Sequence, residues 1–104
     1  MVNWPWIART FTLDFPAAKF PDLLERVRGT PARIEARVCD LSTDVLTRQD
    51  GKGWSIQENI GHLLDLGYLP LRRIEQILAG EGELIAADMT NRKTNEAAHN
   101  ASHI

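Results

Sequence analysis

One histidine, His62, lies where it could hold a metal ion in a fixed position. Ser55, followed three residues later by Glu58, forms a capping box, in which each side chain accepts a hydrogen bond from the other residue's backbone N–H. We therefore expect a helix that begins at Ile56, with His62 about two turns inside it. An imidazole that far from a fraying helix end can be held rigidly, as a metal ligand requires.

Two carboxylates share the helical face of His62, because Glu58 lies four residues before it and Asp65 three residues after it. Either carboxylate could orient the imidazole by accepting its second ring N–H, as happens around many metal-bound histidines. The alternatives are plainer. Glu58 would serve only the capping box, Asp65 would pair with a surface cation, and His62 would be a border residue at the edge of the apolar face.

A second pair of histidines, His99 and His103, has the spacing that places two imidazoles on one helical face, which is a geometry found in zinc sites. The residues around this pair are small and polar, so the segment is prone to fray. We favour the interpretation that it opens a third helix, with metal binding by the pair as the alternative. Cys39 is expected to pack rather than react, since it lies near a helix C-terminus, away from any cationic setting.

The elements that must position these residues are predicted to be helices. Apolar residues recur at steps of three and four from Pro21 to about Leu41, which predicts a helix over 21–41. Pro31 is its weak point, because a proline inside a helix removes a hydrogen bond and collides with the preceding turn. The helix either kinks there or restarts with Thr30 as its cap, and the unbroken apolar stripe favours one kinked helix.

The same spacing predicts a second helix over 56–79 that ends at Gly80. Pro70 should bend this helix near Gly67. A short third helix is expected over 95–104. Residues 1–19 contain several aromatic side chains and two prolines, and we expect them to form an extended arm that packs its rings against the helices.

Composition excludes several classes of protein. A length of 104 residues allows at most one domain. Lys and Arg number 12 against 14 Asp and Glu, a net charge of −2, so no basic field would attract nucleic acid. No apolar run is long enough for a membrane span. A single cysteine cannot form an internal disulfide framework and suits a cytoplasmic protein.

Taken together, these motifs resemble the DinB/YfiT-like superfamily of metal-binding four-helix bundles. The resemblance is carried mainly by residues 53–65, where an aromatic residue, a Ser cap and Glu are followed by His-Leu-x-Asp. It extends to three further short stretches, 24–33, 79–80 and 87–89. It implies an all-α, up-and-down bundle. Residues 1–104 would form a single domain with two long helices and a short third, an incomplete bundle cut short at its C-terminal end.

The resemblance also implies a function. In this family three histidines bind a divalent metal such as Zn²⁺ or Ni²⁺, and His62 matches the first of them. The other two histidine ligands come from a His-x-x-x-His motif on the last helix of the family's bundle. His99 and His103 align instead with the start of the third helix, so they do not match that motif. The implied activity is that of a metal-dependent hydrolase or of a transferase acting on a low-molecular-weight thiol. The alternative is a non-catalytic helical module for assembly or regulation.

The predicted helices require a second copy of the chain as their partner. Two long helices cannot cover their own apolar stripes, and each Å² left exposed forgoes about 25 cal/mol of stabilisation. A homodimer in which two such hairpins pack together would rebuild a four-helix core. We expect no nucleic-acid partner and no membrane partner.

Overall fold

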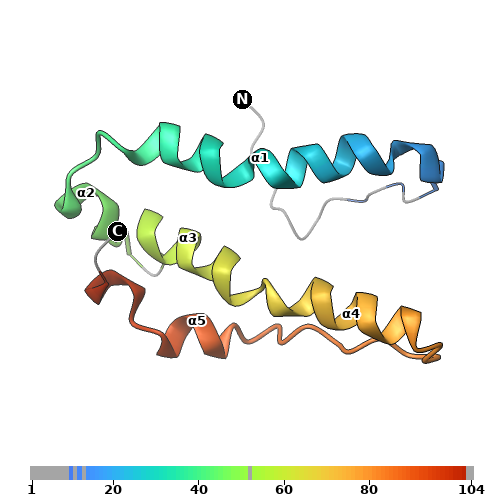
Figure 1. The fold of residues 1–104 in the computed structure, drawn as a ribbon. Helices are drawn as coiled ribbons and strands as arrows, with labels where there is room; N and C mark the ends of the chain where they lie inside the picture. Colours follow the sequence, from blue (N-terminus) through green and yellow to red (C-terminus); the bar gives the residue numbers. More distant parts are fainter. Residues whose placement is uncertain (1–9, 11, 13, 52, 103–104) are drawn as a thin grey trace. The chain divides into compact units, whose positions relative to one another are not determined.

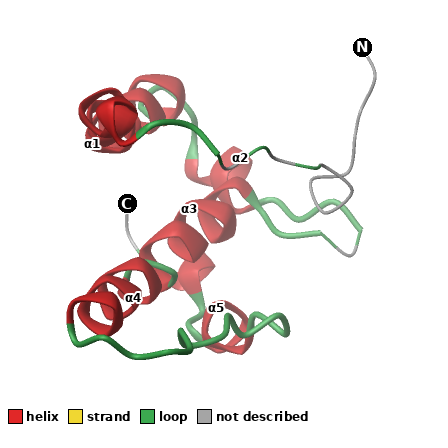
Figure 2. Cartoon of the chain, turned by 90° about the vertical axis from the view of Figure 1, so that its right-hand side faces the viewer, coloured by secondary structure: helices red, strands yellow, loops and turns green. Residues whose placement is uncertain are grey.

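All regular structure in the described part of the chain is helical (Figures 1 and 2). The computed structural model describes residues 10, 12, 14–51 and 53–102. The predicted all-α class is therefore confirmed. Among these residues, no helix combines the length and apolar character needed to cross a membrane. The chain divides into two compact units, Met1–Cys39 and Asp40–Ile104.

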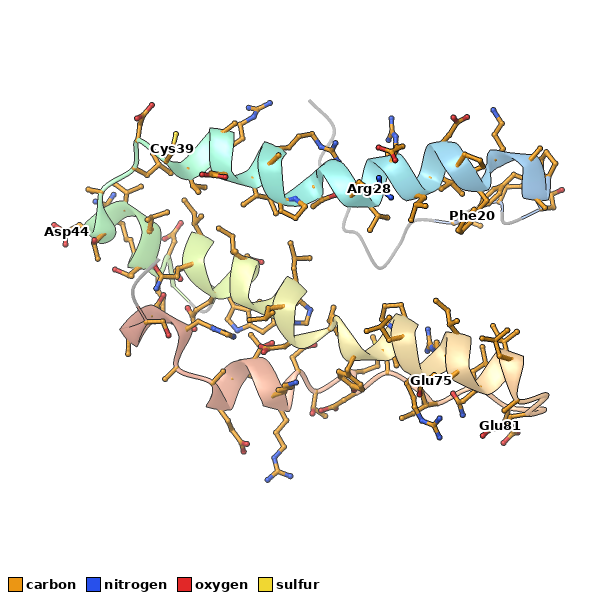
Figure 3. All side chains as sticks on the ribbon, viewed as in Figure 1. Phe20, Arg28, Cys39, Asp44, Glu75 and Glu81 are labelled. Carbon is orange, nitrogen blue, oxygen red and sulfur yellow. The ribbon has the colours of Figure 1, made fainter. Side chains whose placement is uncertain are left out.

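The first unit consists of a short 3-10 turn, η2 (Ala17–Lys19), and one long helix, α1 (Phe20–Val38). Side chains project from α1 along its whole length, from Phe20 to the end of the helix (Figure 3). The helix continues through Pro31, so the prediction of one helix rather than two is correct. The aromatic packing predicted for the arm over 1–19 depends mainly on residues that lie outside the described part of the chain.

Thr30 does not cap a new helix. Its Oγ1 donates to the backbone carbonyl of Arg26 at 3.1 Å, which is the usual bond of a hydroxyl inside a helix. Arg33 adds a second hydrogen bond to the same carbonyl. These side-chain bonds lie in the turn that Pro31 disturbs, where the proline cannot donate one.

The second unit begins with a short helix that the sequence analysis did not predict, α2 (Thr43–Thr47). Its N-cap is Ser42, whose Oγ accepts a hydrogen bond from the N–H of Val45 at 3.3 Å. Leu46 from this helix is buried, and α2 packs against the helix that carries His62. The segment is polar except for two apolar residues, so its periodicity is too short to reveal a helix.

The predicted helix over 56–79 is two helices, α3 (Ile56–Asp65) and α4 (Tyr68–Leu78). The interruption lies at Gly67, where the bend was predicted. Leu66 and Gly67 keep right-handed helical backbone angles, but the N–H groups of Gly67 and Leu69 donate to carbonyls three residues earlier instead of four. The reason is Pro70, whose ring would collide with the carbonyl four residues earlier in a continuous helix. In the observed arrangement Pro70 is in the first turn of α4, where its missing N–H is harmless.

Gly80 ends α4 as predicted, with φ +73°. The N–H of Glu81 donates to the carbonyl of Gln76 at 3.0 Å, and that of Gly80 to the carbonyl of Ile77 at 3.1 Å. This pair of bonds is the Schellman motif, which satisfies the last carbonyls of a helix.

The predicted helix over 95–104 is wrong. The structure instead has α5 (Arg92–Glu96) and a 3-10 turn, η3 (His99–Ala101). They are separated by Ala98, whose φ of +54° cannot continue a right-handed helix. Both elements pack against α3. His103 lies outside the described residues, so the structure does not test the proposed histidine pair.

Buried side chains in the second unit are mostly polar. Among the described residues, two apolar side chains are buried, Leu46 and Leu69, against five polar ones: Ser55, Gln57, Asp65, Gln76 and Thr94. Every buried polar side-chain atom among the described residues has a hydrogen-bond partner, as burial of such groups requires. Polar contacts around α3 are therefore a large part of the buried interior of this unit.

Candidate functional site

The site is built on the first turn of α3, where the predicted capping box is present. The N–H of Glu58 donates to Oγ of Ser55 at 3.1 Å, and the N–H of Ser55 donates to Oε1 of Glu58 at 3.0 Å. The bond from Ser55, followed by one from the amide of Gln49, holds the pKa of Glu58 below its usual value. Glu58 thus serves the cap, and the interpretation that it orients His62 is wrong.

His62 is held by two residues from outside α3. Its Nδ1 lies 2.9 Å from Oγ1 of Thr94, and its ring packs on Trp54 with ring centroids 4.8 Å apart. The indole N–H of Trp54 in turn donates to Oδ1 of Asn95 at 3.0 Å. Consecutive residues of α5 therefore fix both the imidazole and the aromatic ring against which it packs.

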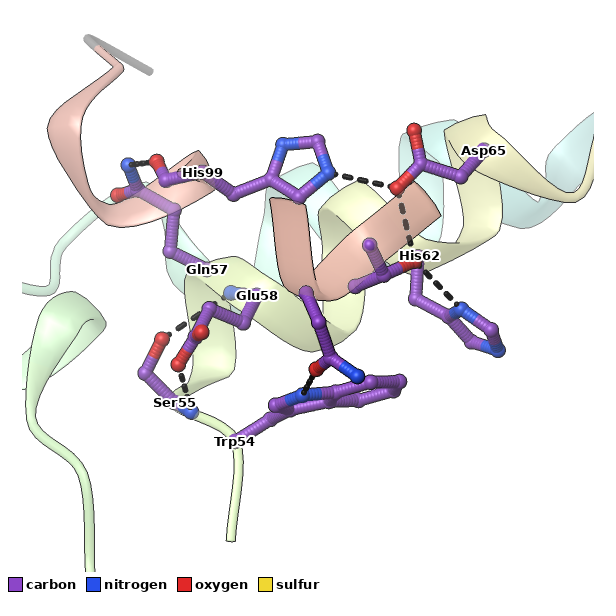
Figure 4. A network of polar contacts seen from close by, with 9 residues as sticks. Trp54, Ser55, Gln57, Glu58, His62, Asp65 and His99 are labelled. Carbon is purple, nitrogen blue, oxygen red and sulfur yellow. Dashed lines mark hydrogen bonds and ion pairs between the residues drawn. The ribbon is translucent and has the colours of Figure 1, made fainter. Parts of the chain in front are cut away.

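Asp65 is buried and joins two segments of the chain (Figure 4). Its Oδ2 accepts a hydrogen bond from Oγ1 of Thr94 at 2.8 Å and lies 2.8 Å from Nε2 of His99. The bond from His99, and after it the bond from Thr94, keep the pKa of Asp65 below its usual value, although burial acts in the opposite direction. Neither sequence-based interpretation of Asp65 was right: among the described residues, its carboxylate is linked to His62 through Thr94, and its salt-bridge partner is the part-buried His99, not a surface cation.

The segment that carries His99 is anchored along α3. The side-chain amide of Gln57 donates to the backbone carbonyls of His99 and Ser102 at 2.6 and 2.7 Å. The hydroxyl of Ser55 donates to Oδ1 of Asn100 at 2.6 Å. Sequence analysis missed this docking, because it joins residues more than 40 positions apart.

Gly61 makes the approach of His99 possible. A Cβ added to Gly61 would lie 2.3 Å from Cγ of His99, closer than any real contact, so the imidazole rests on bare helix backbone. A glycine in the middle of a helix costs about 1 kcal/mol relative to Ala. Its presence next to His62 was a sequence signal for close packing at this position.

A small cavity of about 50 Å³ adjoins His62 and Asp65. Its volume is enough for a water molecule or a small ion. The remaining lining residues come from the C-terminal end of α3, from α4 and α5, and from the loop between α4 and α5: Leu66, Tyr68, Asp88, Asn91, Lys93 and Thr94. Oδ1 of Asp88 accepts two hydrogen bonds from Thr90, from its side chain at 2.6 Å and its N–H at 2.9 Å, which lower the pKa of Asp88.

The described residues do not make a complete metal centre. Within them, no three His, Cys, Asp or Glu side chains lie close enough together to hold one ion. They provide His62, together with the groups that orient it, Thr94 and Trp54. A complete centre would need ligands from outside the described residues.

Comparison with known proteins identifies the family of this chain. Neither the curated proteins nor the solved structures that were compared gave a match. A family model described as the DinB superfamily matches residues 26–102. This range covers well over half of the chain and includes His62, Asp65, Thr94 and His99. The chain therefore belongs to the DinB superfamily.

Proposed function

We propose that this chain contributes His62 as a ligand to a divalent metal, Zn²⁺ or Ni²⁺, in a metal-dependent hydrolase or low-molecular-weight-thiol transferase. The observation that supports this proposal most is the contact of Nδ1 of His62 with Thr94 at 2.9 Å. A metal-bound histidine almost always makes such a bond with its other ring nitrogen, because the bond fixes the orientation of the ring. Among the described residues, the hydrogen bonds leave Nε2 of His62 unused.

The residues around His62 suit this role. Trp54 packs on one side of the imidazole, with ring centroids 4.8 Å apart. The cavity beside His62 and Asp65 has room for a water molecule or a thiol sulfur but not for a whole substrate. A divalent ion bound here would lower the pKa of a coordinated water or thiol and so supply a nucleophile at neutral pH.

The second candidate function is a non-catalytic helical module for assembly or regulation. It is favoured by the completeness of the polar network, in which each buried polar side-chain atom of the described residues already has a partner. A network of this kind is sufficient to dock α5 and η3 onto α3 without any metal. In this reading His62 is a packing partner of Trp54.

Metal titration separates the two functions. We expect Zn²⁺ or Ni²⁺ at a hundredfold excess over its dissociation constant to stabilise the chain by about 2.7 kcal/mol in thermal or urea unfolding. The gain should vanish in His62→Gln, and it should weaken below about pH 6, because a protonated imidazole cannot coordinate a metal. Absence of binding in calorimetry would support the non-catalytic module.

Two further variants identify the ligand. With Trp4 and Trp6 replaced by Phe, the fluorescence of Trp54 reports on the imidazole packed against it, and it should change with metal only while His62 is present. The control is His99→Ala combined with His103→Ala. If this double variant abolishes metal binding while His62→Gln retains it, the C-terminal pair is the site and the assignment of His62 is wrong.

A further inference from the structure

Three segments of the second unit meet in one chain of hydrogen bonds (Figure 4). Nδ1 of His62 lies 2.9 Å from Oγ1 of Thr94, and the same Oγ1 lies 2.8 Å from Oδ2 of Asp65. Nε2 of His99 reaches the same carboxylate oxygen at 2.8 Å. One carboxylate oxygen is thus connected to two imidazoles, to His99 directly and to His62 through the hydroxyl of Thr94.

The positions of the protons in this chain follow from counting donors. A threonine hydroxyl has a single hydrogen, and an ionised carboxylate can only accept. Asp65 is held in its ionised form by its hydrogen bonds, which lower its pKa. The hydrogen of Thr94 must therefore point to Asp65, since the opposite arrangement would place two acceptor oxygens 2.8 Å apart with no hydrogen between them.

With its hydrogen committed to Asp65, Thr94 can only accept a bond from His62. Nδ1 of His62 must then carry a hydrogen. A neutral imidazole has one N–H, so Nε2 is left with a free lone pair. This is the nitrogen that does not contact Thr94, and it is the one able to coordinate a metal or accept a proton.

We propose that Thr94 is a positioning residue that fixes His62 as the Nδ1–H tautomer and presents the lone pair of Nε2 as the ligand. Its value to a metal centre rests on the proposed function, whereas the tautomer is a property of the chain alone. Thr94 suits the task, since it is only 2% exposed and a β-branched side chain has few rotamers. Trp54 restrains the plane of the imidazole, and Thr94 fixes its direction.

The tautomer can be measured without metal, by nitrogen NMR of ¹⁵N-histidine-labelled protein at about pH 8, above the ordinary histidine pKa of about 6.5. We expect His62 of the wild type to be the Nδ1–H form. Thr94→Ser keeps the hydroxyl and should keep this form, whereas Thr94→Val keeps the shape and should populate the Nε2–H form. An Nε2–H spectrum for the wild type, or an unchanged spectrum in Thr94→Val, would overturn the proposal.

Amide-proton dispersion in one-dimensional proton spectra of the same samples shows whether each variant is folded. If Thr94→Val does not fold, the wild type and Thr94→Ser still decide the matter, because either one in the Nε2–H form refutes the assignment. The Zn²⁺ affinity is a second readout. It should fall by about 10–100-fold in Thr94→Val and remain close to the wild-type value in Thr94→Ser.

The two measurements separate this proposal from the function on which it builds. If Zn²⁺ binds through His62 while Thr94→Val keeps both tautomer and affinity, the role of Thr94 is refuted and the metal site stands. If Zn²⁺ does not bind at all, the proposed function is refuted, and the wild-type spectrum alone confirms or refutes the tautomer.

Discussion

Replacement of Gly61 by Ala tests the packing of η3 on α3 most directly. The new methyl group would lie 2.3–2.5 Å from three atoms of the His99 ring, so the imidazole must move away. That movement breaks the contact between Nε2 of His99 and Oδ2 of Asp65, which is 2.8 Å long. The change therefore sets a local gain in helix propensity against the loss of a long-range contact.

The magnitude follows from these two effects. Ala in the middle of a helix is favoured over Gly by about 0.5–1 kcal/mol, whereas a hydrogen bond to a charged group contributes about 1.5–3 kcal/mol. We expect Gly61→Ala to lower the free energy of unfolding by about 0.5–2.5 kcal/mol. The free energy of unfolding should fall further if the backbone of α3 also has to shift.

A double-mutant cycle isolates the cause. In a His99→Ala background the ring is absent, so Gly61→Ala should stabilise the protein by about 0.5–1 kcal/mol. The sign of the effect should reverse between the two backgrounds, with a coupling of about 1.5–3 kcal/mol. Urea unfolding followed by circular dichroism measures all four proteins. Equal effects in both backgrounds, or a more stable Gly61→Ala in the wild-type background, would refute the packing of His99 on Gly61.

Two other predictions concern pH and association. The pKa of Asp65 is lowered by His99 and Thr94, with a smaller contribution from the charge of Lys93. The ionised carboxylate therefore stabilises the fold fully above the unfolded pKa of about 4, and this stabilisation is lost as pH falls through the lower folded pKa. Acid unfolding should accordingly be less steep in Asp65→Asn, and an unchanged pH profile would contradict this. Two copies of the chain should associate, because within its own unit α4 leaves Leu71, Ile74 and Leu78 more than half exposed. Sedimentation over a range of concentrations tests this. A chain that stays monomeric at every concentration and still melts cooperatively would exclude the dimer.

Features with a local cause could be predicted from the sequence. The capping box at Ser55 and the glycine stop at Gly80 depend on residues within one turn of each other, and both are present. The interruption near Gly67 was located from Pro70 for the same reason. The sequence did not show the form of this junction, since Pro70 indicates where the α-helical hydrogen bonds must stop but not which bonds replace them.

Features that join distant segments could not be predicted in this way. The sequence analysis placed Asp65 beside His62 on one helical face, but which donor reaches the carboxylate depends on how α5 and η3 dock. The sequence analysis did not single out Thr94, which is buried inside α5 and bonded to Asp65. Hydroxyl residues are common at caps and turns, so nothing in the local pattern distinguished this one.

The same atoms stabilise the fold and orient the candidate ligand. Oδ2 of Asp65 holds His99, which docks η3, and Thr94, which aims His62. Any change to this carboxylate will therefore alter stability and the orientation of His62 together, and a loss of metal affinity in Asp65→Asn would not by itself assign a role in metal binding. Thr94→Val and Gly61→Ala act on different sides of the carboxylate. If the two roles are separable, the first should change the tautomer of His62 and the second should leave it unchanged.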